Sequence, residues 1–306
     1  MSEAMLDIIK VALTTSVTGL VLAQGLQVSP ADLLAVRRRP GLLLRAVLAG
    51  YVLVPLATLV IVLLVRPARN VEVGLALLAA APVAPLMVVR IPRSGGGLAH
   101  VVALHLAMTV FALAATPIVL AVMKSALAFE ARVNYPSIAW LIARVVVLPV
   151  CIGVAIHAWR PALARRWAEW LSRAFWVVFA IVTVVVLVLG AGTLTRVDVR
   201  SYAAMVLSVA AALLIGHAVA PRAPAERLTM AMITAARHPG VVLLVAAASF
   251  PAADVLAVLI PYLIVFLIAS TVYVRWTAAL AQMQMPPGQD AHPFAGAHPQ
   301  LSGVKP

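Results

Sequence analysis

The sequence predicts an all-α membrane protein that crosses the bilayer many times. Of its 306 residues, 64% are hydrophobic and 11% are charged, whereas roughly 25% of the residues in a soluble domain are charged. The mean hydropathy is +1.08. Long apolar stretches recur from Leu6 to about Thr277, and no interval between them is long enough for a soluble domain. Helices are expected because lipid cannot satisfy the unpaired backbone groups of an open sheet.

Nine apolar stretches have the length of a membrane-spanning helix, which needs about 20 residues at a rise of about 1.5 Å each. Most neighbouring stretches are separated by boundary residues, namely Pro30, Arg39-Pro40, Pro67, the glycine-rich Ser94–Gly97, Pro136, Pro161 and Pro221. The predicted spans, in chain order, are residues 6–26, 41–65, 71–93, 97–123, 137–158, 172–192, 199–219, 226–250 and 252–275.

The two ends of the chain carry different signals. The first span follows Met1-Ser2-Glu3 rather than a basic segment, so we expect a retained helix and not a cleaved signal peptide. The last residues contain Pro286-Pro287-Gly288 and little apolar surface, a composition typical of disorder. The sequence therefore predicts one nine-span transmembrane domain over residues 1–281 and a disordered cytoplasmic tail over residues 282–306.

The net charge of +13 is interpreted as membrane topology. The basic residues lie in short loops without an interleaved aromatic patch, which argues against a nucleic-acid partner. Fourteen Lys and Arg fall on one side of the membrane and seven on the other. By the positive-inside rule we expect a multi-pass protein of the cell inner membrane with its N-terminus outside and its C-terminus in the cytoplasm. The larger set is Arg37, Arg38, Arg39, Arg45, Arg90, Arg93, Arg160, Arg165, Arg166, Arg173, Arg222, Arg227, Arg275 and Lys305, and the smaller is Lys10, Arg66, Arg69, Lys124, Arg132, Arg196 and Arg200.

Two of the nine spans contain helix breakers near mid-membrane. The third holds Ala81-Pro82-Val83-Ala84-Pro85 and the eighth holds Arg237-His238-Pro239-Gly240. Proline removes an amide donor, so each span can divide into two half-helices with free polar ends at membrane depth. In secondary transporters, discontinuous helices in corresponding positions of the two halves form the substrate site. Ordinary proline kinks are the alternative interpretation.

Motifs along the chain resemble those of the bile acid:sodium symporter family, in the family's order and from the first span to the ninth. The segments that carry the resemblance are Gly19-Leu20 through Ser29–Leu33 to Arg39-Pro40, Val54-Pro55, Glu72–Leu75 to Ala81-Pro82, Ala115–Pro117, and Leu228–Met230 to Ala247–Phe250. The resemblance implies an inverted repeat of five plus five helices whose first helix is often missing. It also implies a panel unit made of spans one, five and six, and a core unit that contains the two crossing helices.

The chain departs from the family where sodium binds. Sodium-coupled members carry Cys-Pro-Gly-Gly-x-x-Ser-Asn and Glu-x-Gly-x-Gln-Asn-Ser in the crossing helices, whereas this chain has Ala81–Val88 and Ile233–Pro239. A family hydroxyl falls at His105 and a family glutamine at Gly50. A hard cation needs several oxygen ligands, and all ten acidic residues fall near span ends or beyond. The sequence therefore supports neither sodium coupling by the family mechanism nor an acidic proton relay.

Positive charge takes the place of the sodium site. Arg237 lies near the middle of its span, where an arginine costs about 2.5 to 3.5 kcal/mol on insertion scales, so it is expected to face the core rather than lipid. Snorkelling towards the cytoplasmic surface is the alternative. His238 either caps the half-helix that begins at Pro239 or contacts the ligand. Arg90 is either a topology charge or a second basic wall of the site. The predicted substrate-binding set is Arg237, His238, His105, Pro82, Pro85, Pro239 and Arg90.

The sequence lacks the catalytic motifs of several common enzyme classes. His-Glu-x-x-His, a pair of mid-membrane aspartates, Gly-x-Ser-x-Gly and a Walker lysine are all missing from the sequence. The single cysteine, Cys151, permits neither an intrachain disulfide nor a cysteine-rich metal site. We therefore expect no catalytic residues, no cofactor and no metal. The predicted function is a secondary transporter of a small organic anion in the lipid bilayer, and the alternative is a transport-inactive sensor or interaction protein on the same fold.

Overall fold

The computed structural model describes residues 3–84, 98–129, 133–189, 192, 197–247 and 252–283. Seven helices in these ranges are long and apolar enough to cross a membrane, and they coincide with seven of the nine predicted spans. They are Asp7–Gly25, Pro40–Val65, Val101–Leu127, Tyr135–Trp159, Pro161–Val185, Val199–Val219 and Val258–Leu280. The remaining two predicted spans are those with internal breakers. The all-α, polytopic fold class is confirmed.

Proline at the first helical turn starts many of the helices, because its fixed φ suits that position and its missing amide costs nothing there. This is the case at Pro30, Pro40, Pro161, Pro224 and Pro239. The helices are α1 (Glu3–Gly25), α2 (Pro30–Arg37), α3 (Pro40–Leu48), α4 (Val54–Val65), α5 (Arg69–Ala80), α7 (Leu98–Leu127), α8 (Tyr135–Ile142), α9 (Leu148–Trp159), α10 (Pro161–Leu189), α12 (Val199–Val219), α13 (Pro224–Ala235), α14 (Pro239–Ala247) and α15 (Ala252–Met283).

Two details differ from the sequence-based expectation. The predicted sixth span starts at residue 172, whereas α10 begins at Pro161. Its first turns carry Arg165, Arg166 and Glu169 and form an amphipathic extension that the predicted span leaves out. In addition, α15 runs to Met283, so the first two residues of the predicted tail are helical, and residues 284–306 lie outside the described part of the chain.

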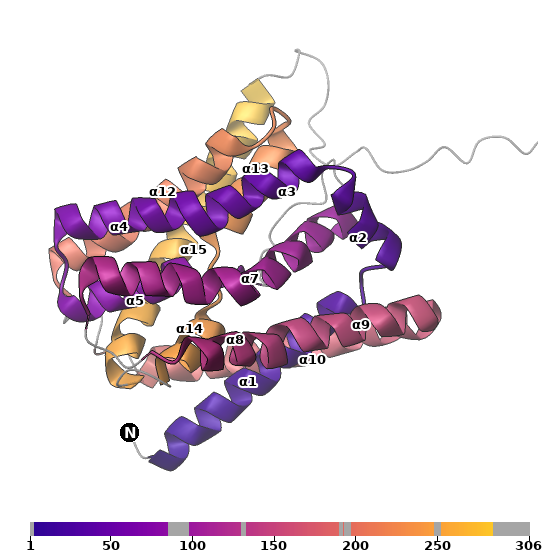
Figure 1. Ribbon diagram of the computed structural model, residues 1–306, viewed down its shortest axis with the longest axis horizontal. Helices are drawn as coiled ribbons and strands as arrows, with labels where there is room; N and C mark the ends of the chain where they lie inside the picture. Colours follow the sequence, from indigo (N-terminus) through magenta and orange to yellow (C-terminus); the bar gives the residue numbers. More distant parts are fainter. Residues whose placement is uncertain are drawn as a thin grey trace, which may run out of the picture.

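The helices pack as two units. One, called the panel, consists of α1, α8, α9 and α10, in which α1 packs along both α10 and α9. The other, called the core unit, consists of α3, α4, α5, α7 and α12 to α15, with α12 packed against α4, α13 and α15. Figure 1 shows the panel helices along the lower side, with α14 of the core unit beside α8 and most of the core unit above them. The inverted repeat that the family resemblance implies stays a prediction.

Two glycines let the panel helices approach each other closely, as small residues do in membrane proteins. A Cβ atom on Gly153 of α9 would lie 2.6 Å from the carbonyl oxygen of Leu22 in α1 and 2.7 Å from the amide nitrogen of Leu26, just after α1. A Cβ on Gly25 would lie 2.5 Å from the Val150 carbonyl oxygen. The backbones of α1 and α9 are therefore in direct contact at this point.

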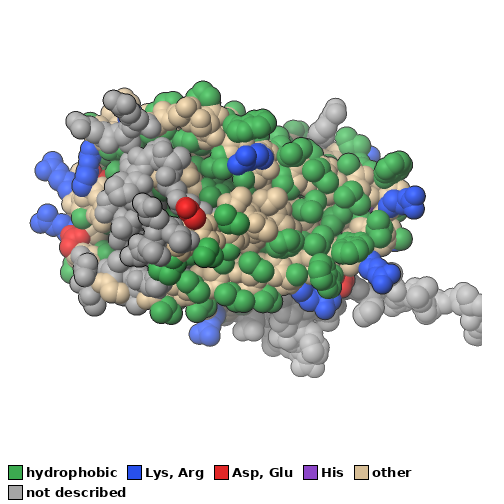
Figure 2. Space-filling view, turned by 90° about the horizontal axis from the view of Figure 1, so that it is seen from below, with side chains coloured by type: hydrophobic (Ala, Val, Ile, Leu, Met, Phe, Trp, Pro, Cys, Tyr) green, Lys and Arg blue, Asp and Glu red, His purple; other side chains and the backbone are tan. Residues whose placement is uncertain are grey.

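Large hydrophobic side chains cover much of the surface, including Leu64, Val188 and Trp159. In Figure 2 hydrophobic side chains cover most of the described middle of the molecule, and the basic side chains on that face lie mostly near the two ends of the long axis. Such a large exposed apolar surface is unusual for a soluble monomer. It suits a protein whose flanks are solvated by lipid.

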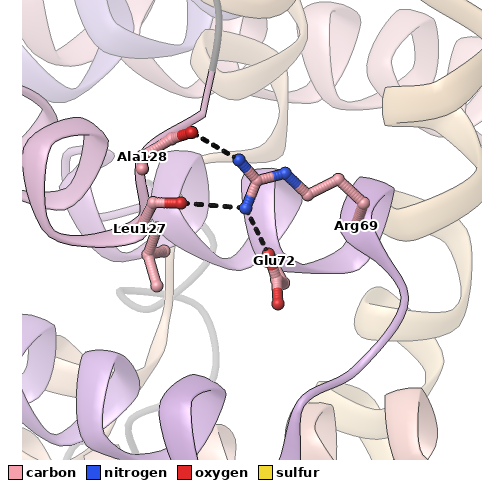
Figure 3. Close-up of polar contacts among 4 residues, drawn as sticks. All are labelled: Arg69, Glu72, Leu127 and Ala128. Carbon is pink, nitrogen blue, oxygen red and sulfur yellow. Dashed lines mark hydrogen bonds and ion pairs between the residues drawn. The ribbon is translucent and has the colours of Figure 1, made fainter.

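An arginine joins the start of α5 to the end of α7 (Figure 3). Arg69, at the start of α5, donates to the carbonyl oxygens of Leu127 at 2.9 Å and Ala128 at 2.7 Å, and it pairs with Glu72 at 2.6 Å. Ala128 has a positive φ of 48°, the left-handed conformation that commonly ends helices. The guanidinium therefore satisfies the last carbonyls of α7, where the helix dipole favours a positive charge.

Substituting Gly153 with alanine should destabilise the panel, because the new methyl group meets backbone atoms that cannot rotate away. We expect a loss of about 1 to 3 kcal/mol, seen as a lower unfolding midpoint of the purified protein in detergent. Gly41→Ala is the matched control, since a Cβ at Gly41 meets nothing within 4 Å. Equal midpoints for the two variants would show that the α1–α9 contact is looser than described.

Candidate functional site

At both predicted breaks a helix ends in extended backbone. α5 ends at Ala80, and the next residue, Ala81, is extended with φ −66° and ψ 149°. α13 ends at Ala235, Ala236 is extended, and α14 begins at Pro239. Proline accounts for both, since it lacks an amide donor and disfavours helical backbone in the residue before it. The eighth span is thus discontinuous rather than kinked, and the third is described as far as residue 84.

The two breaks lie against each other and pair. Val83 and Arg237 form an antiparallel bridge. The Ala84 amide donates to the Ala236 carbonyl oxygen at 3.1 Å, and the His238 amide donates to the Pro82 carbonyl oxygen at 2.9 Å. Backbone groups that each broken helix leaves free are therefore satisfied by the other one, as a polar backbone inside a membrane protein requires.

The paired segments, residues 82–84 and 236–238, are called the crossing. The side chain of Arg237 is buried there and only 5% exposed. Its Nη2 donates to the Gly50 carbonyl oxygen at 2.8 Å and its Nη1 to the Ala81 carbonyl oxygen at 3.3 Å. Ala81 is the C-terminal cap of α5, where a cation is favoured by the helix dipole. The buried position excludes the snorkelling alternative for this conformation.

The Gly50 carbonyl is free to accept because of a π-helical turn, Ala49–Leu53, between α3 and α4. In that turn the Val54 amide bonds to the Ala49 carbonyl oxygen instead of the Gly50 one. The next residue, Pro55, has no amide to offer. Gly50 therefore lacks a helical donor, and Arg237, 187 positions away in sequence, supplies one.

Two histidines stand next to the crossing, His105 from α7 and His238 from the break itself. Both are 2% exposed, and they are close enough to interact electrostatically. Nδ1 of His105 and both ring nitrogens of His238 have no hydrogen-bond partner among the described residues. The His238 carbonyl accepts from the Val242 amide, so His238 caps α14 through its backbone while its imidazole is left for another partner.

The crossing also touches the panel. A Cβ on Gly240, in the first turn of α14, would lie 2.8 Å from Val17 Cγ2 and 3.4 Å from Leu13 Cδ1 of α1. α14 further packs against α8 and α5. The second broken helix therefore reaches from the interior of the core unit to the surface of the panel.

The structure brings together five of the seven predicted site residues. Pro82, Arg237, His238 and Pro239 belong to the paired breaks, and His105 stands beside them. Pro85 and Arg90 lie outside the described residues. The side chains that sequence reasoning missed are buried tyrosines: Tyr51 donates to the Met108 carbonyl oxygen at 2.9 Å, and Tyr262 stands near the Arg237 guanidinium. The Val54-Pro55 pair in the middle of the second span was the signal in the sequence that could have indicated the π-helical turn Ala49–Leu53.

Residues 17–197, more than half of the chain, match the family model described as the Sodium Bile acid symporter family. The match contains the first broken helix and most of the panel, and it ends before α12 to α15. A comparison with curated proteins gave no match.

Substituting Arg237 with glutamine should destabilise the core unit, because Gly50 and Ala81 lose a charged donor. The expected loss is about 1.5 to 3 kcal/mol, the range for a hydrogen bond to a charged group, measured as the unfolding midpoint in detergent. Arg144→Gln is the matched control: Arg144 also lies within a predicted span and in a π-helical turn, but its side chain is exposed. If the midpoint falls no further in Arg237→Gln than in the control, the hydrogen bonds from Arg237 to Gly50 and Ala81 do not stabilise the core unit.

Proposed function

Because the chain belongs to the Sodium Bile acid symporter family, a family of transporters rather than enzymes, we propose that it moves a small organic anion across the membrane by alternating access. The panel and the core unit are the two bodies that rock against each other around a fixed site. The observation that carries the proposal is the pairing of the extended backbone after α5 with the break between α13 and α14. This is the arrangement that holds substrate in secondary transporters.

The crossing offers groups that suit an anion. The N-terminus of α14 begins there, and a helix N-terminus carries partial positive charge and free amides. Nδ1 of His105 and both ring nitrogens of His238 lack partners among the described residues and can donate or accept according to tautomer. These groups, close to the α14–α1 contact, form the proposed substrate-facing part of the site. The proposal that Pro85 and Arg90 add to it stays a prediction.

We infer that Arg237 stands in for the sodium of coupled relatives. Its guanidinium binds the carbonyl of Gly50, the position at which the resemblance places a glutamine of sodium-coupled members. Two unit charges 4 Å apart repel by about 4 kcal/mol at an effective dielectric constant of about 20. A second cation beside Arg237 would therefore bind poorly. Because the guanidinium of Arg237 takes the place of the bound sodium ion, we expect transport that does not require sodium.

The same arrangement would also serve a transport-inactive sensor, because a tethered cation leaves no sodium gradient to use. Counterflow distinguishes the two functions, since it needs no coupling ion. Proteoliposomes loaded with unlabelled taurocholate and diluted into labelled taurocholate should accumulate label transiently. Estrone sulfate is a second probe, and both anions stay charged at neutral pH.

Arg144→Gln liposomes should behave like wild type in counterflow, and protein-free liposomes give the background. Folded wild-type protein that binds either probe yet shows no counterflow above background would make the chain a sensor. Folded protein that neither binds nor transports either probe would contradict the proposed substrate class.

The positive-inside pattern leads to a proposed orientation in the inner membrane with the N-terminus outside and the C-terminus in the cytoplasm. A reporter that is active only outside the cytoplasm should therefore be inactive when fused after Pro306. The same reporter fused after Phe129, between α7 and α8, should be active, because four spans precede it. Activity of the first fusion and silence of the second would reverse the orientation.

A further inference from the structure

A small cavity of about 10 Å³ lies in the core unit and is lined in part by Arg237. Its polar lining consists of Arg237, Tyr262 of α15, Ser208 of α12 and Thr58 of α4, and apolar side chains of α4, α5 and α12 complete it. All of these elements belong to the core unit. The cavity has room for about one water molecule. A chloride ion is somewhat larger and would need the lining side chains to move outwards slightly, whereas an organic substrate is far too large.

The polar lining is buried and incompletely satisfied. Ser208 is 5% exposed, and its hydroxyl has no hydrogen-bond partner among the described residues. Thr58, Tyr262 and Arg237 are each at most 5% exposed. Buried polar groups of native proteins nearly always have a partner, either in the protein or in an ordered molecule or ion. The free hydroxyl therefore indicates that something occupies the cavity.

The charge of the lining selects the occupant. Arg237 carries a full positive charge, and its hydrogen-bond acceptors are the neutral carbonyls of Gly50 and Ala81. No carboxylate lines the cavity, and the described ion pairs involve Arg39, Arg69 and Arg173 instead. A buried charge is stable when an opposite charge accompanies it. Guanidinium and hydroxyl groups are hydrogen-bond donors, which suit an anion and repel a cation.

We propose that this cavity binds one chloride ion, held by the Arg237 guanidinium and the hydroxyl groups of Ser208, Tyr262 and Thr58. The ion would accept hydrogen bonds from Arg237 and join α4, α12 and α15 to the break between α13 and α14. The inference goes beyond the proposed transport and does not rest on it, since the site is lined by the core unit alone and its occupancy can be measured without substrate.

The test is thermal unfolding of the purified full-length protein in detergent while sodium chloride is replaced stepwise by sodium gluconate. Sodium and ionic strength stay constant, and gluconate is too large for the cavity. The unfolding midpoint should rise with chloride in a saturable way by on the order of 3 °C. Bromide should act as chloride does. A midpoint that is independent of chloride, or that rises equally with gluconate, overturns the proposal.

Three variants locate the effect. Arg237→Gln should lose the chloride-dependent rise, whereas Arg200→Gln, at an exposed arginine of α12, should keep it. Ser208→Val fills the cavity and leaves Arg237 in place, so it should also lose the rise, and it decides the matter if Arg237→Gln does not fold. A chloride-dependent rise that persists in Ser208→Val overturns the assignment to this cavity.

Diffraction from crystals grown in bromide gives the direct measurement. An anomalous peak beside the Arg237 guanidinium is expected. Its absence in well-ordered crystals would show that the cavity holds water.

Discussion

The hydrogen bond from Arg237 to the Gly50 carbonyl oxygen, 2.8 Å long, is the interaction on which the arrangement of the core unit depends. A guanidinium in the middle of a membrane protein must find acceptors, because an unpaired charge there is very costly. It finds them in carbonyls that local sequence has freed: Gly50, which the π-helical turn and Pro55 leave without a donor, and Ala81, at the end of α5. One side chain thus joins three segments that are far apart in the chain.

This interaction gives the two breaks a role in the proposed mechanism. They are held by backbone hydrogen bonds in one direction and by Arg237 in another, so in the proposed alternating access they would move with the core unit as one body. The α14–α1 contact at Gly240 is the place where that body meets the panel. In the same proposal a fixed cation takes the place of an ion that coupled relatives capture and release in each cycle, and the substrate gradient supplies the driving force.

The sequence was sufficient to predict the features that depend on local chemistry. Span lengths follow from apolar runs, and the breaks at Pro82 and Pro239 follow from missing amides. Arg237 was expected to face the core because of its insertion cost. The acceptor at Gly50 could not be predicted, since it depends on a contact across 187 positions and on a turn whose hydrogen-bond pattern a proline only permits. The start of α10 at Pro161 was missed because its first turns are amphipathic. The partners of His105 and His238, and the roles of Pro85 and Arg90, stay predictions.

The most direct test of the central claim is whether sodium binds. The unfolding midpoint of wild-type protein in detergent would be measured while sodium is exchanged for potassium or N-methylglucamine, at constant chloride and ionic strength. If Arg237 has replaced the bound cation, the midpoint should be the same in all three salts. A saturable rise that is specific to sodium and persists when Arg144 is replaced by glutamine would show an intact sodium site and contradict the account.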